Sequence, residues 1–166
     1  PTPKKAAHMD VQLKEVLTPR ELSQFIRFPH ALYKGNPCWV PPLTSDEFNT
    51  LRKDKNPAFE TCSARYWLAL SPQGQVVGRI AAIINRRHVE KWNQPYVRFG
   101  WFDFIDDFSV SAALLNVVEE WAAQSGMTAV HGPLGFTDLD REGMLIEGFD
   151  ELGTLATNYN FPYYAR

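Results

Sequence analysis

Asp103 is the residue of this sequence best placed for acid–base chemistry. It stands between Phe102 and Phe104 in a stretch rich in aromatic residues. If this stretch is a strand, its side chains alternate, which puts Trp101, Asp103 and Ile105 on one face. A carboxylate in an apolar cleft has a raised pKa and can serve as a general base. The alternative is an acidic residue at a strand edge, or one held by a neighbouring backbone group.

His131 is the one histidine expected beside a site, because it ends a short apolar stretch. We predict a part in substrate binding, and the alternative is a buried, hydrogen-bonded histidine. No group of His, Cys, Asp and Glu has the spacing of a zinc site, so no metal is expected. Cys38 and Cys62 are expected to be free thiols, as in a cytoplasmic protein.

Two charged clusters have opposite sign. Between Asp138 and Glu151 there are six acidic residues and one basic residue, Arg141. A cationic substrate such as an amine could dock there, and the alternative is a solvated loop. The basic cluster is interpreted either as an anion site or as a solvated hairpin. It consists of Arg79, Arg86, Arg87, Lys91 and Arg98.

Composition excludes two classes of partner. The 166 residues carry a net charge of −2, whereas a general nucleic-acid binder needs a basic face to neutralise phosphates. Apolar runs are only a few residues long, so no segment is expected to span a membrane. Residues 1–8 have the character of a tag remnant, and we treat residues 9–166 as one domain.

Local patterns predict the elements that would position Asp103. Two capping boxes, Thr18–Glu21 and Thr44–Glu47, should open helices, and Ser109 should cap the longest helix. The Phe28–Pro29 step should bend or end the first helix. Strands are predicted over 11–17, 64–70, 76–84, 96–105 and 128–131, with a further short one over 144–146.

The predicted order is strand, helix, helix, three antiparallel strands, helix, strand. A helix between two strands of one sheet makes them parallel through a right-handed crossover. The fold class is therefore α/β (α+β), with a mixed, mostly antiparallel central sheet flanked by helices. This order is characteristic of the GNAT acetyltransferase sheet up to its fifth strand.

Several segments also resemble a family of bacterial GNAT-like proteins. They are 28–43, 56–59, 78–82, 99–103, 132–136, 147–150 and 159–164. Members of that family have a second GNAT-like half. The resemblance implies that residues 9–166 are a single GNAT-like domain, the N-terminal lobe, lacking the last strands of the complete fold.

The resemblance implies acyl transfer from acetyl-CoA to an amine. Asp103 would be the general base and Tyr159 the general acid, with Trp39, Trp101 and His131 binding substrate. Coenzyme binding would fall to Phe104, Ile105, Ser109 and Val110.

The glycine loop that holds the coenzyme pyrophosphate in such enzymes is missing. Residues 106–111 contain no glycine and no basic residue, and Asp106 and Asp107 would repel a polyanion. The alternative is therefore a non-catalytic GNAT-like lobe that binds a ligand or a partner. Expected partners are a second copy or a second lobe, because the fifth strand is a sheet edge and aromatic residues are predicted to be exposed. These aromatic residues are Trp39, Phe161, Tyr163 and Tyr164.

Overall fold

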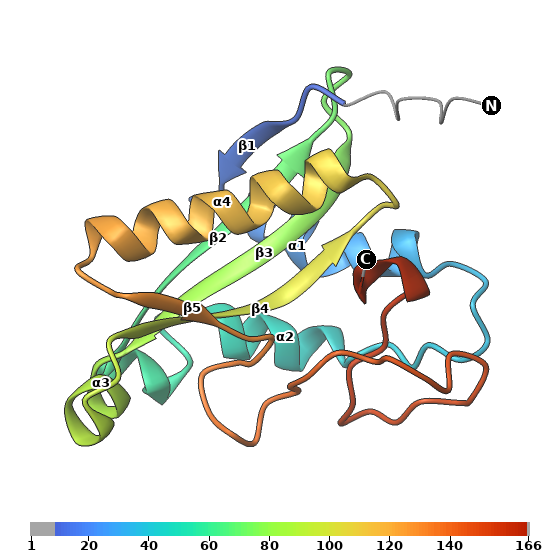
Figure 1. Cartoon of the computed structure of the whole chain (residues 1–166). Coiled ribbons are helices and arrows are strands. Elements are labelled where there is room, and N and C mark those ends of the chain that lie inside the picture. Colours follow the sequence, from blue (N-terminus) through green and yellow to red (C-terminus); the bar gives the residue numbers. More distant parts are fainter. Residues whose placement is uncertain (1–8, 166) are drawn as a thin grey trace.

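A central sheet of five strands organises the computed structural model, which describes residues 9–165 (Figure 1). The predicted tag remnant, residues 1–8, lies outside the described residues. The strands are β1 (Gln12–Glu15), β2 (Cys62–Leu70), β3 (Val76–Asn85), β4 (Tyr96–Phe104) and β5 (Ala129–His131). The helices are α1 (Pro19–Leu32), α2 (Thr44–Leu51), α3 (Arg86–Trp92) and α4 (Phe108–Gln124), with short 3-10 turns at Pro57–Glu60 and Pro162–Ala165.

The strands lie side by side in chain order. β1 to β4 pair antiparallel, and β5 pairs parallel to β4 after the crossover through α4. This confirms the predicted mixed, mostly antiparallel sheet. Residues 144–146 do not form the further strand predicted for them, and a short helix, α3, stands where a plain hairpin was expected.

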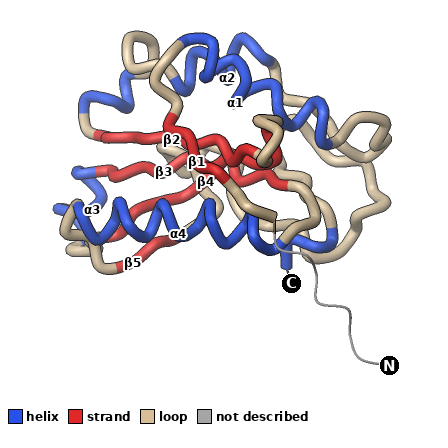
Figure 2. Tube along the Cα trace, turned by 90° about the horizontal axis from the view of Figure 1, so that it is seen from above, coloured by secondary structure: helices blue, strands red, loops and turns tan. Residues whose placement is uncertain are grey.

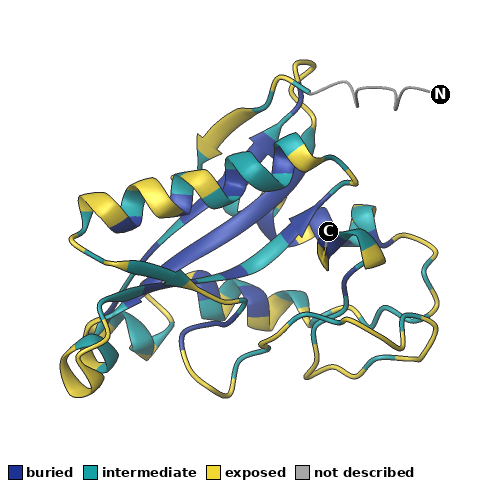
Figure 3. Cartoon of the chain, in the orientation of Figure 1, coloured by how far each residue is buried: buried dark blue, intermediate teal, exposed yellow. Residues whose placement is uncertain are grey.

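Helices cover both faces of the sheet (Figure 2). On one face α4, the long helix that the sequence predicted, buries Val110, Leu114, Val118 and Ala122 against β3 and β4. On the other face α1 and α2 pack Phe25, Ile26 and Leu51 against β2 and β3. β3, which lies between the two layers, is the most deeply buried strand (Figure 3).

A β-bulge interrupts β4 beside the site. Gly100 pairs with Ala81 and Asp103 with Arg79, so two β4 residues, Trp101 and Phe102, lie opposite one β3 residue. Trp101 adopts a φ of 45°, which is uncommon for a residue other than glycine. Bulges re-aim side chains, and this one puts Trp101 on the α1–α2 face together with Asp103. Ile105 does not share the face of Trp101 and Asp103 as predicted, because it lies beyond the end of the strand and packs on the α4 face.

Only one of the predicted helix caps is correct in full. Thr18 and Glu21 form the predicted capping box of α1. α2 begins at Thr44 without a side-chain cap, because Glu47 points inward and does not reach back to Thr44. α4 is capped by Asp107, not by Ser109. α1 does not end at Phe28–Pro29, since the helix continues to Leu32 with Pro29 inside it.

A long segment without regular secondary structure follows β5. It leaves the sheet at Gly132, with the Leu134 amide donating to the Phe99 carbonyl (2.8 Å), and passes below the end of the sheet (Figure 1). Much of it is exposed (Figure 3). It ends in the turn Pro162–Ala165, which lies beside the end of β4.

Candidate functional site

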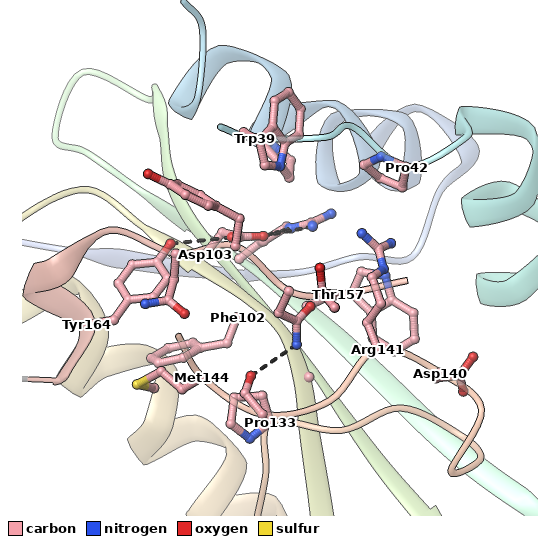
Figure 4. Close-up of a pocket in the computed structure, with 18 of the residues that line it drawn as sticks. Trp39, Pro42, Phe102, Asp103, Pro133, Asp140, Arg141, Met144, Thr157 and Tyr164 are labelled. Atoms are coloured by element: carbon pink, nitrogen blue, oxygen red, sulfur yellow. Dashed lines mark hydrogen bonds and ion pairs between the residues drawn. The ribbon is translucent and has the colours of Figure 1, made fainter. Parts of the chain in front are cut away.

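The bulge of β4 forms the floor of a polar cavity of about 110 Å³. Figure 4 shows Trp39 and Pro42, from the α1–α2 connection, on one side and Met144 and Pro133, from the long segment, on the other. Known small-molecule sites enclose about 300–1,000 Å³. This cavity is smaller than such sites and has the size of one end of a ligand.

Asp103 anchors a buried network on the cavity wall. Its Oδ1 accepts from the hydroxyls of Tyr33 (2.8 Å) and Tyr164 (3.3 Å), and its Oδ2 accepts from Arg79 Nε (2.8 Å). Arg79 Nη2 lies 2.7 Å from the same oxygen. Both carboxylate oxygens thus accept two donors each and have no lone pair left for a substrate proton. This arrangement is closer to an acidic residue held by its neighbours than to a general base.

Pro29 explains how Arg79 reaches this position. A proline inside a helix has no N–H to donate to the carbonyl four residues earlier. The carbonyl that this leaves free belongs to Phe25, and it accepts from Arg79 Nη1 (2.9 Å). The guanidinium also lies over the Phe25 ring, 5.1 Å from its centroid. The helix defect therefore provides the binding site of a buried arginine.

The network suppresses ionisation of its tyrosines. Burial raises the pKa of both Tyr33 and Tyr164 well above the usual 10, and the negative charge of Asp103 raises them further. Both hydroxyls therefore stay protonated and donate or share hydrogen bonds. The two oxygens lie 2.9 Å apart.

Glu47 is a second buried carboxylate in the cavity. It projects from α2, its Oε2 accepts from Trp101 Nε1 (2.7 Å), and its Oε1 accepts from Arg141 Nη2 (2.7 Å). Glu47 is 6% exposed. Trp101 comes from the bulge and Arg141 from the long segment, and both contact Glu47 at the wall of the cavity.

Tyr159 and Asn160 fasten the long segment over the cavity. The Tyr159 hydroxyl donates to the Phe149 carbonyl (3.1 Å) and accepts from Asn36 Nδ2 (2.9 Å). Asn160 bonds both the amide and the carbonyl of Leu145. The hydroxyl that was predicted to act as a general acid is thus engaged in holding the loop.

Two tyrosines occupy the edge of β4 beyond the short β5. The Tyr163 hydroxyl donates to the Phe104 carbonyl (2.6 Å), and the Phe104 amide donates to the Tyr164 hydroxyl (3.2 Å). Tyr164 is buried, so its predicted exposure for an interface is wrong. Trp39, Phe161 and Tyr163 are half-buried.

The start of α4 carries its own anion. The Asp107 carboxylate accepts from the amide (2.9 Å) and the hydroxyl (2.5 Å) of Ser109, and the Met9 amide donates to the same hydroxyl (3.2 Å). A carboxylate at a helix N-terminus satisfies the positive end of the helix dipole. The phosphates of a coenzyme would compete with Asp107 for these groups.

The predicted site residues separate into two groups. Trp39, Trp101, Asp103 and Tyr159 all line the cavity. His131 does not: it is exposed at the end of β5, beside the Tyr96 ring, because the chain leaves the sheet there, and it is not the buried histidine of the alternative either. The residues predicted for coenzyme binding have other contacts. Phe104 and Val110 are in the core, Ile105 packs against it, and Ser109 belongs to the cap.

The basic cluster is not a uniform solvated hairpin. Arg79 and Arg98 are buried, and Arg98 donates to the carbonyls of Gly135 and Phe136. They are structural and not part of a solvated hairpin.

Within the described residues, no group of three or more His, Cys, Asp or Glu side chains is placed to hold a metal ion. No helix of residues 9–165 has the length and apolar character needed to cross a bilayer.

Comparison with solved structures shows which fold this is. An acetyltransferase of the GNAT family from Staphylococcus aureus Mu50 superposes with a TM-score of 0.51 at 13% identity, over 75% of this chain and 73% of that one. A Pyrococcus furiosus protein assigned as an acetyl transferase gives 0.50 at 12% identity, over 74% and 83%. The chain has the GNAT fold. No protein-family model matches the sequence.

Two curated proteins are similar in sequence. Protein YghO of Escherichia coli K12 is 35% identical over 153 residues, which are 92% of this chain and 39% of that protein. A bacterial ceramide synthase from Caulobacter vibrioides is 30% identical over 146 residues, 87% of this chain and 38% of the synthase. The chain therefore spans about two fifths of the length of these relatives.

Sequence reasoning missed Glu47, Arg79, Tyr33 and Arg141 as members of the site. Glu47 was predicted to belong to a capping box at Thr44, and α2 does not form that capping box. A signal for Arg79 did exist, because Pro29 inside a helical pattern frees a carbonyl that needs a donor. Tyr33 and Arg141 gave no local signal, since only the folded chain brings them beside residues 70 and 94 positions away.

Proposed function

We propose that this chain is the acceptor-binding lobe of an N-acyltransferase that acts on an amphiphilic amine. The observation that carries the proposal is the cavity over the β4 bulge, which combines buried carboxylates with aromatic walls in a GNAT-fold sheet. The similarity to a ceramide synthase supports it, because a ceramide is the fatty amide of a long-chain amine.

The charge of the cavity and its rim suits an amine. Glu47, Asp103 and Asp140 line the cavity together with two cations, Arg79 and Arg141, so the lining carries one net negative charge. Within the pairs Arg79–Asp103 and Arg141–Glu47 the charges balance each other, and Asp140 adds the excess negative charge. An ammonium group is attracted by such carboxylates, whereas a carboxylate or phosphate is repelled. The half-buried ring of Trp39 adds a surface on which a cation can lie.

An apolar tail would find its contacts outside the cavity. The long segment exposes four large aliphatic side chains, and one of them, Leu139, is next to the cavity residue Asp140 in the chain. These side chains are Leu139, Ile146, Leu152 and Leu155, with exposed fractions of 98%, 74%, 71% and 52%. All four belong to the same segment, residues 132–161, that supplies one side of the cavity. The head of the amine would enter the cavity while its chain lies along these residues.

The acyl donor is proposed to bind elsewhere. At the start of α4, Asp107 already occupies the position that a coenzyme pyrophosphate would need, and Asp106 stands beside it in the chain. A second GNAT-like lobe, or a second copy, would then present the thioester. The bound ammonium would first release one proton to solvent, and the neutral amine nitrogen would attack the thioester carbonyl. The C–S bond would break, and the thiolate would take up the second proton that the nitrogen loses.

Three ligands of one chain length test the proposal. Octylamine, octanol and octanoate are titrated into the chain, and binding is followed by tryptophan fluorescence, because Trp39 and Trp101 line the cavity. Octylamine should bind saturably, octanol at least tenfold more weakly, and octanoate not at all. Equal binding of octanoate, or no binding of octylamine, would overturn the proposal. The second result would favour the alternative of a lobe that binds a protein partner.

A further inference from the structure

The two ion pairs of the cavity differ in how firmly their cations are held. Arg79 is 5% exposed, donates to Asp103 and to the Phe25 carbonyl, and lies over the Phe25 ring. It projects from β3 at the centre of the sheet. Moving Arg79 away would leave a buried carboxylate and a helix carbonyl without their donor, so this pair is fixed.

Arg141 is held much less firmly. Its side chain is 24% exposed, and it projects from the segment between β5 and the last turn, where the chain has no helix or strand. The nearest backbone hydrogen bonds of the segment are at Asp140, where the amide donates to the Thr137 carbonyl (3.1 Å), and at Gly143, where the amide donates to the Pro133 carbonyl (2.9 Å). The guanidinium can therefore leave without breaking a strand or a helix.

Glu47 nevertheless requires a cation. Its side chain is 7% exposed, and besides Arg141 it receives the neutral indole N–H of Trp101. A buried carboxylate without a charged partner costs several kcal/mol. If Arg141 leaves, another cation must take its place.

We propose that Arg141 occupies the position of the acceptor's ammonium group, and that the acceptor displaces Arg141 from Glu47. The inference rests on the proposed function and adds to it the residue that binds the head of the substrate. A primary ammonium can donate to the same carboxylate oxygen that now accepts from Arg141, and the indole of Trp101 keeps Glu47 oriented for it. In the wild-type chain Arg141 thus occupies the binding position at Glu47 until an amine displaces it.

Single substitutions separate this exchange from simpler roles. Arg141→Ala vacates the position, so octylamine should bind at least tenfold more tightly than to the wild type. Glu47→Gln removes the charge, and binding should weaken at least tenfold. Arg87→Ala is the matched control, because Arg87 is an exposed arginine on α3, outside the cavity, and its removal should leave octylamine binding unchanged.

Amide hydrogen exchange provides a second measurement that needs no variant. Octylamine should increase exchange in residues 138–142 of the wild type as Arg141 is released, while residues 98–104 of β4 become better protected. If octylamine binds the wild type but Arg141→Ala weakens or does not change the affinity, or if exchange of 138–142 decreases, the displacement is wrong and the proposed function stands. If octylamine binds neither protein, the proposed function itself is wrong.

Discussion

Asp103 is the centre of a buried hydrogen-bond network on the cavity wall. Its place in an aromatic strand predicted a carboxylate facing a cavity, and the structure puts it there. The saturation of both oxygens by Tyr33, Tyr164 and Arg79 makes it the centre of a network that joins α1, β3, β4 and the last turn. Its main physical contribution is to hold these elements together.

Loss of the Asp103 charge should therefore destabilise the fold. Asp103→Asn leaves Arg79 as a buried cation without its counter-charge, and breaking such a pair costs about 3–5 kcal/mol. Asp54→Asn removes the partner of Arg52 at an exposed site, where a pair contributes about 0–1 kcal/mol. Urea unfolding of both variants measures the difference. Equal losses would show that the Asp103 network contributes no more than a surface pair.

At the scale of elements, the capping box of α1 gives a pH-dependent prediction. Hydrogen bonds from the Leu17 amide, the Lys14 ammonium and the Thr18 amide lower the pKa of Glu21 from 4.5 to about 2. Because the pKa is lower in the folded chain, this stabilisation is complete above pH 4.5 and is lost as the pH falls towards 2. The difference in unfolding free energy between wild type and Glu21→Gln should shrink over that interval. A difference that is constant with pH would contradict the assignment.

The bulge of β4 requires glycine at position 100. A Cβ there would lie 2.5 Å from the Leu134 carbonyl oxygen, which is fixed backbone. A Cβ at Gly78 would meet the Val110 and Leu114 side chains at 2.8 and 2.9 Å and the Asp103 carbonyl oxygen at 3.2 Å, so its backbone contact is looser than that at Gly100. Gly100→Ala should therefore cost about 1–3 kcal/mol, as overpacking does, and Gly78→Ala less. Thermal unfolding compares them, and the reverse order would show that the segment after β5 yields easily.

Elements were predictable where local chemistry determines them. The α1 capping box, the long helix α4 and the strands β2 and β3 all follow from spacing within a few residues. Predictions that required a choice between local and distant partners were wrong. Glu47 could cap its own helix or bond Trp101 and Arg141, and burial in the folded chain decides for the latter. The order of the sheet was predictable because short connections and the crossover rule leave few alternatives.

For the whole molecule, the two faces of the sheet have different characters. The start of α4 is capped by Asp107, and the adjacent edge of β4 is occupied by Tyr163 and Tyr164. The cavity lies on the opposite face, roofed by the α1–α2 connection and the long segment. We propose that this lobe has kept an acceptor site while another lobe or copy supplies the donor site, in the cytoplasm where acyl-CoA is available.

Thermal unfolding with each ligand tests this division most directly. A ligand at 100 times its dissociation constant stabilises a fold by about 2.7 kcal/mol, so a bound ligand raises the unfolding temperature measurably. We expect a concentration-dependent rise with octylamine and no rise with millimolar acetyl-CoA. A rise with acetyl-CoA and none with octylamine would contradict it.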